Sequence, residues 1–69
     1  MKLRVNGEEL YINNSSEEYS LLEALNQLGY KNNNIIVELN NLIINNTSWH
    51  KRNVKDGDKL EIVSIVGGG

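Results

Sequence analysis

The sequence contains no cysteine, proline or phenylalanine, and it has a single histidine. Without cysteine there is neither a disulfide framework nor a thiolate metal site, so the fold of this 69-residue chain must depend on aliphatic packing. A chain this short buries only about 60 % of its unfolded surface and cannot support two cores. We therefore expect one small domain, in a reducing compartment.

Basic charge and long apolar runs are also scarce. The formal net charge is −2, which leaves no basic surplus to neutralise phosphates, so nucleic acid is not an expected partner. Polar residues interrupt the N-terminal stretch MKLRVNGEEL every few positions, which argues against a signal-peptide core or a membrane span there. The sequence predicts a cytoplasmic protein that does not bind membranes.

Few residues could support catalysis or metal binding. A nucleophile needs an activating base and an orienting partner, and the only imidazole is that of His50, in a polar segment. One imidazole with scattered carboxylates has no recognisable metal-ligand spacing. The pairs Glu8–Glu9 and Glu17–Glu18 should point apart as parts of a solvated charged edge. We expect no catalysis by this chain alone, no metal and no cofactor.

The first twelve residues predict a β-hairpin. Leu3 and Val5 alternate with basic residues before Asn6–Gly7, and Leu10 and Ile12 alternate with Tyr11 after it. Both central residues of a type I′ turn need positive φ, which Asn and Gly tolerate.

One amphipathic helix should follow in the segment SLLEALNQLG. Ser20 and Glu23 have the spacing of a capping box, and Gly29 supplies a left-handed stop. Four leucines at helical spacing are expected on one apolar stripe: Leu21, Leu22, Leu25 and Leu28.

The second half reads as three strands. Residues 35–39 are apolar on both faces except at Glu38, which predicts an inner strand; residues 42–44 form a short strand after the Asn40–Asn41 turn, and residues 59–66 form the last strand. Trp49 and Val54 should anchor the loop between them. The order ββαβββ predicts an α+β fold, a β-grasp of the ubiquitin-like type, in which a mixed four- to five-stranded sheet packs on one helix.

In the last strand, Leu60 and Ile62 share one face while Val63 and Ile65 share the other. If the first pair faces the helix, the second pair faces outward. Val63, Ile65 and Val66 are then either a partner-docking surface or ordinary exposed hydrophobic residues.

The sequence closes on Gly67, Gly68 and Gly69. We expect a β-grasp domain over residues 1–66 and a flexible glycine tail over residues 67–69. Three extended residues span about 10 Å, and without Cβ atoms they can thread a narrow channel in a partner's active site. The carboxylate of Gly69 would be the reactive group; the alternative is an inert end.

Taken in order, these segments resemble the ThiS-type sulfur carrier proteins of thiamine biosynthesis. The resemblance runs through VNGEE, LLEALNQLG, VELN, Trp49, DGD and EIVSIVGGG. Where such carriers often have a proline and a basic residue, this chain has Asn45 and Asn46.

The resemblance implies a carrier that is not itself an enzyme. An E1-like, ThiF-like adenylyltransferase would activate the Gly69 carboxylate with ATP, a cysteine persulfide would supply sulfur, and a ThiG-like thiazole synthase would consume the resulting thiocarboxylate. Three alternatives remain at this point: a small subunit of molybdopterin synthase, a ubiquitin-like protein modifier, and a non-catalytic interaction domain.

Overall fold

The computed structural model describes residues 1–13, 18–30 and 34–65. The expected domain limits at 1–66 and 67–69, with Val66 and the three terminal glycines, therefore fall outside the described residues. Within the described residues, no helix is both long and apolar enough to cross a membrane.

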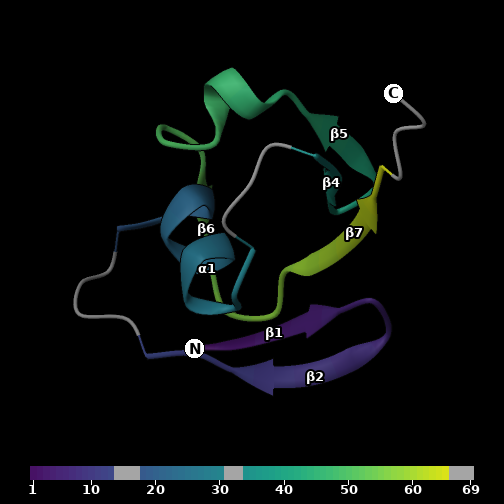
Figure 1. Cartoon of the computed structure of the whole chain (residues 1–69). Coiled ribbons are helices and arrows are strands. Elements are labelled where there is room, and N and C mark those ends of the chain that lie inside the picture. The colour runs from purple at the N-terminus through teal and green to yellow at the C-terminus, as the bar shows by residue number, and fades with distance from the viewer. Residues whose placement is uncertain (14–17, 31–33, 66–69) are drawn as a thin grey trace.

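The elements in chain order (Figure 1) are β1 (Lys2–Val5), β2 (Glu8–Tyr11), β3 (Tyr19–Ser20), α1 (Leu21–Gln27), β4 (Ile35–Leu39), β5 (Leu42–Ile44), the 3₁₀ helix η1 (Asn46–Ser48), β6 (Asn53–Val54) and β7 (Lys59–Ser64).

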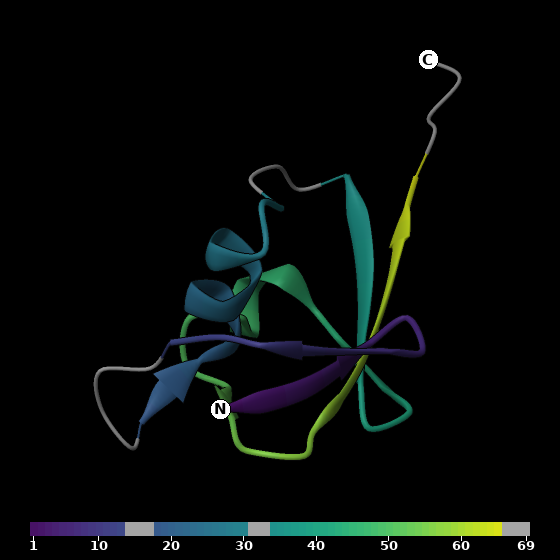
Figure 2. The same ribbon diagram turned by 90° about the horizontal axis from the view of Figure 1, so that it is seen from below.

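The main sheet has five strands in the order β2-β1-β7-β4-β5. β1 and β7 are parallel, whereas β1–β2, β7–β4 and β4–β5 are antiparallel. The helix covers one face of this sheet (Figure 2). The predicted mixed sheet on a single helix is confirmed, and β4 is the inner strand that its apolar sequence indicated.

Positive-φ residues make the tight turns. Asn6 and Gly7 have φ angles of 50° and 84°, and Asn40 and Asn41 have φ angles of 51° and 72°. These values suit two-residue hairpin turns between β1 and β2 and between β4 and β5. Asn6 also accepts a hydrogen bond on Oδ1 from the Ile62 N–H at 2.7 Å and donates from Nδ2 to the Ile62 carbonyl at 3.2 Å. The first hairpin is thereby tied to β7.

The helix begins and ends as predicted. The Glu23 N–H donates to Ser20 Oγ at 3.0 Å, and the Ser20 N–H donates to Glu23 Oε1 at 3.1 Å, which completes the capping box. Gly29 ends the helix with φ of 98°.

The predicted apolar stripe of the helix needs a correction. Leu22 is exposed and Leu28 is only partly buried, whereas Ala24 is fully buried. Leu22 lies one residue, or about 100° of helix rotation, from Leu21. The buried stripe is therefore built on Leu21, Ala24 and Leu25.

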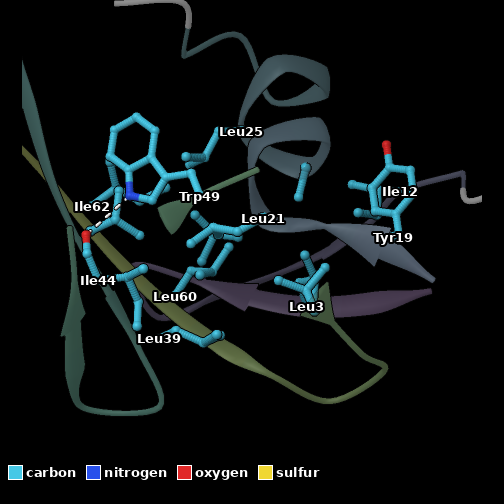
Figure 3. Close-up of a cluster of buried hydrophobic side chains, with 14 of the residues drawn as sticks. Leu3, Ile12, Tyr19, Leu21, Leu25, Leu39, Ile44, Trp49, Leu60 and Ile62 are labelled. Carbon is cyan, nitrogen blue, oxygen red and sulfur yellow. Dashed lines mark hydrogen bonds between the residues drawn. The ribbon is translucent and has the colours of Figure 1, made fainter. Parts of the chain in front are cut away.

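The loop after β5 is held down by Trp49 and Val54, both buried as predicted. Trp49 donates from Nε1 to the Ile44 carbonyl at 3.0 Å (Figure 3).

Two features were not predicted. One is η1, which Asn45 caps by accepting a hydrogen bond from the Thr47 N–H at 3.0 Å. The other is the small sheet formed by β3 and β6. Further hydrophobic residues of the buried core include Leu3, Val5, Leu21, Leu25, Val37 and Leu60.

Candidate functional site

The face of the main sheet opposite α1 carries an apolar surface. Along β7, Leu60 and Ile62 are buried and Val63 is 60 % exposed, and Ile65, just after the strand, is 49 % exposed. The predicted outward orientation of Val63 and Ile65 is therefore confirmed. Whether they bind a partner stays a prediction.

β4 and β5 extend this surface. Ile36 pairs directly with Val63 across β4 and β7, and Ile43 pairs with Glu38 across β5 and β4. Ile36 and Ile43 are 41 % and 65 % exposed. Sequence reasoning missed both, because an unbroken apolar run does not show which of its side chains face the helix. Their pairing with outward-facing residues of neighbouring strands reveals it.

Two carboxylates interrupt the apolar surface. Glu38 and Glu61 are direct cross-strand partners on the outer face, and both are half-buried. In the described part of the chain, neither takes part in an ion pair; the ion pair found there joins Arg4 and Glu9 at 3.4 Å. We call the surface formed by these residues the outer patch, and its members are Ile36, Glu38, Ile43, Glu61, Val63 and Ile65.

The outer patch reaches the point at which the chain leaves the sheet. Ser64 pairs with Ile35, and the Ile65 N–H donates to the Asn34 carbonyl at 2.8 Å. Only four residues separate Ile65 from the end of the sequence. Gly67, the first of the three glycines, therefore follows the outer patch after one intervening residue.

A shallow depression adjoins the outer patch beyond β5. The residues that line it are Ile35, Ile36, Ile43, Ile44, Asn45, Asn46 and Trp49. Asn45, which caps η1, is thus also part of the wall of this depression.

Other groups considered for chemistry remain apart. His50 is exposed in the turn after η1, and Glu8 and Glu9 are exposed on β2; Glu17 lies outside the described residues. Across residues 1–13, 18–30 and 34–65, no three His, Asp or Glu side chains are grouped so that they could hold a metal ion.

Comparison with known proteins identifies the family to which the chain belongs. The ThiS family model matches residues 3–69. The crystal structure of the thiamine biosynthesis protein ThiS from Geobacter metallireducens superposes with a TM-score of 0.82 at 31 % identity and covers 100 % of both chains.

Two further relatives, one much longer than this chain and one of similar length, also match it. The chain is 42 % identical over 69 residues to a thiazole synthase of Paramagnetospirillum magneticum, covering 100 % of this chain and 20 % of that protein. It is 38 % identical over 69 residues to the uncharacterized protein ycf40 of Pyropia yezoensis, covering 100 % of this chain and 93 % of that protein.

The fold is thus a β-grasp, the small ubiquitin-like architecture. The chain belongs to the ThiS family. It is a sulfur carrier of thiamine biosynthesis, a small protein on which enzymes act and not an enzyme itself.

Proposed function

We propose that the carboxylate of Gly69 is the sulfur-carrying group. The observation that carries this proposal is the family match, which extends to residue 69 and so includes Gly67, Gly68 and Gly69. A carboxylate at the end of three residues without side chains can enter an active site that a bulkier chain would block. The sequence has no cysteine, which is consistent with a carrier that holds sulfur on a main-chain carboxylate.

The chemistry requires two enzymatic partners. An E1-like adenylyltransferase directs the Gly69 carboxylate onto the α-phosphate of ATP, which releases pyrophosphate and gives an acyl adenylate. The terminal sulfur of a cysteine persulfide then attacks the acyl carbon and displaces AMP. A thiol cleaves the resulting disulfide, leaving the thiocarboxylate on Gly69. ATP and thiols are both available in the cytoplasm, where we propose that the protein acts.

Thiazole synthase is the proposed acceptor of the sulfur. The relative from Paramagnetospirillum magneticum has a carrier-like segment within a protein named thiazole synthase, which supports a shared pathway for the two parts. This family evidence favours a role in thiamine biosynthesis over the three alternatives: a small subunit of molybdopterin synthase, a protein modifier and an interaction domain.

We propose that the adenylyltransferase and thiazole synthase dock on Val63 and Ile65, together with Val66.

Intact-mass spectrometry tests the proposal. The chain is incubated with ATP, the adenylyltransferase of the same organism, a cysteine persulfide donor and a thiol, and we expect one terminal oxygen to be replaced by sulfur. The control carries one additional residue after Gly69, which converts the reactive carboxylate into an amide and leaves the core unchanged. If the extended chain acquires sulfur as readily as the parent, the reaction does not require a free carboxylate on Gly69 and the proposal is wrong.

A further inference from the structure

The charges at the centre of the outer patch are arranged unfavourably for the isolated protein. Glu38 and Glu61 are paired directly across β4 and β7 on the same face, and like charges in this position destabilise a sheet. Both are half-buried, whereas the neighbouring side chains of Ile36 and Val63 are 41 % and 60 % exposed. The carboxylates are thus less accessible than the apolar groups beside them.

No basic side chain of the described residues forms an ion pair with either carboxylate. On the same face, Lys59 lies two residues before Glu61 on β7 and opposite Arg4 on β1, and Arg4 pairs with Glu9. Within residues 1–13, 18–30 and 34–65, no ion pair joins either Glu38 or Glu61 to a cation. The pair therefore has the capacity to accept a cation from outside the chain.

We propose that the outer patch binds an enzyme surface that places one arginine or lysine between Glu38 and Glu61 and surrounds it with apolar side chains. An arginine fits best, because its planar guanidinium can donate to both carboxylates at once. This inference rests on the proposed function: the enzyme in question is the adenylyltransferase, which must hold the tail that follows Ile65. Contact with Ile36, Ile43 and Val63 removes apolar area from water, while the cation neutralises carboxylates that would otherwise be buried unpaired.

Charge also argues against a second copy of the chain as the occupant. A twofold-symmetric pair centred on the outer patch would apply the same surface from both sides and would bring the carboxylates of Glu38 and Glu61 from both copies together. Like-charge contacts of this kind suppress association. The complementary surface is therefore one of opposite charge.

Binding measurements on charge-neutral variants test this assignment. Glu38→Gln and Glu61→Gln keep the size and shape of the side chain, and Glu8→Gln removes one negative charge from an exposed position on β2, so it serves as the matched control. With the adenylyltransferase of the same organism as the probe, we expect each patch variant to raise Kd about five- to tenfold at low salt, and Glu61→Lys to raise it about a hundredfold. The control should change Kd less than about twofold, and the difference should shrink as salt increases.

Three results would overturn the inference. One is a Kd for Glu38→Gln and Glu61→Gln that matches that of Glu8→Gln. Another is a concentration-dependent dimer of the parent that the two patch variants strengthen, which would assign the surface to self-association. The third is a fall in the thermal midpoint of the patch variants large enough to explain weaker binding, because the inference requires them to fold at least as stably as the parent.

The same samples separate this inference from the proposed function. If the parent acquires sulfur and the patch variants bind like the control, the cation site is wrong and the Gly69 chemistry stands. If the parent neither binds the adenylyltransferase nor acquires sulfur, the proposed function fails and the cation site fails with it.

Discussion

The two faces of the β4–β7 strand pair are built from one register and have opposite character. On the inner face, Val37 pairs with Ile62 and Leu39 pairs with Leu60, and all four side chains are buried. On the outer face, Ile36 pairs with exposed Val63, and Glu38 pairs with Glu61. The inner ladder has the composition expected of selection for folding. The outer ladder exposes aliphatic groups and opposes two like charges, a composition better suited to binding than to stability.

The largest effect on stability should come from the inner ladder. Leu60 is fully buried between the sheet and α1 (Figure 3). Replacing it with alanine leaves a cavity, and we expect Leu60→Ala to lower the free energy of unfolding by about 2 to 5 kcal/mol. The matched control on the same strand is Val63→Ala, which should change it by less than about 0.5 kcal/mol because the side chain is exposed. Urea denaturation followed by circular dichroism measures both; equal losses would mean that the two faces do not differ as described.

The next effect concerns binding and should be confined to the outer ladder. Val63→Asp or Ile65→Asp places a further carboxylate where the partner excludes water, so we expect the adenylyltransferase to bind at least about tenfold more weakly. Stability should fall by no more than about 1 kcal/mol, because both positions are exposed in the free chain and the new carboxylate adds only to the repulsion between Glu38 and Glu61. Titration calorimetry with Tyr11→Asp as control, at an exposed site on edge strand β2, measures the difference. Unchanged affinity in both variants would place the docking surface elsewhere.

A smaller effect is expected where the first hairpin meets β7. The Asn6 side chain makes two hydrogen bonds to the Ile62 backbone while its own φ is positive. Asn6→Gly keeps the turn geometry but loses both bonds, and should cost about 1 to 2 kcal/mol. Asn41→Gly is the control, because it has positive φ in the other hairpin turn. A cost for Asn6→Gly no greater than that for Asn41→Gly would show that the bonds to Ile62 contribute little.

Features with a strong local cause could be predicted from the sequence. The Asn6–Gly7 turn depends on positive φ, and the capping box on a three-residue spacing, so each signal lies within a few residues. Local pattern did not predict β3 and β6, since a two-residue strand is too short to show alternation. η1 depends on a cap by the Asn45 side chain, which the sequence analysis did not predict.

The residues of the candidate site likewise fall into those that local sequence predicts and those that it does not. The exposure of Val63 and Ile65 followed from alternation along one strand. Ile36, Ile43 and the Glu38–Glu61 pair required the register between strands far apart in the sequence, which tertiary packing sets. The terminal glycines were singled out by their chemistry and by family resemblance, and their assignment still rests on these grounds.

The smallest expected effect bears most directly on why the two faces differ. In the free protein Glu38 and Glu61 repel each other across β4 and β7, so neutralising one of them should stabilise the fold. We expect Glu38→Gln to raise the free energy of unfolding by about 0.2 to 1 kcal/mol at low salt, and the gain should decline as salt screens the repulsion. Glu8→Gln, whose Cα partner in β1 is the apolar Val5, should show no comparable gain. The measurement is the denaturation midpoint at two salt concentrations. If Glu38→Gln is more stable than the parent and yet binds the adenylyltransferase more weakly, the repulsion between Glu38 and Glu61 is one that a partner relieves on binding. If Glu38→Gln is less stable than the parent, the two carboxylates instead support the fold.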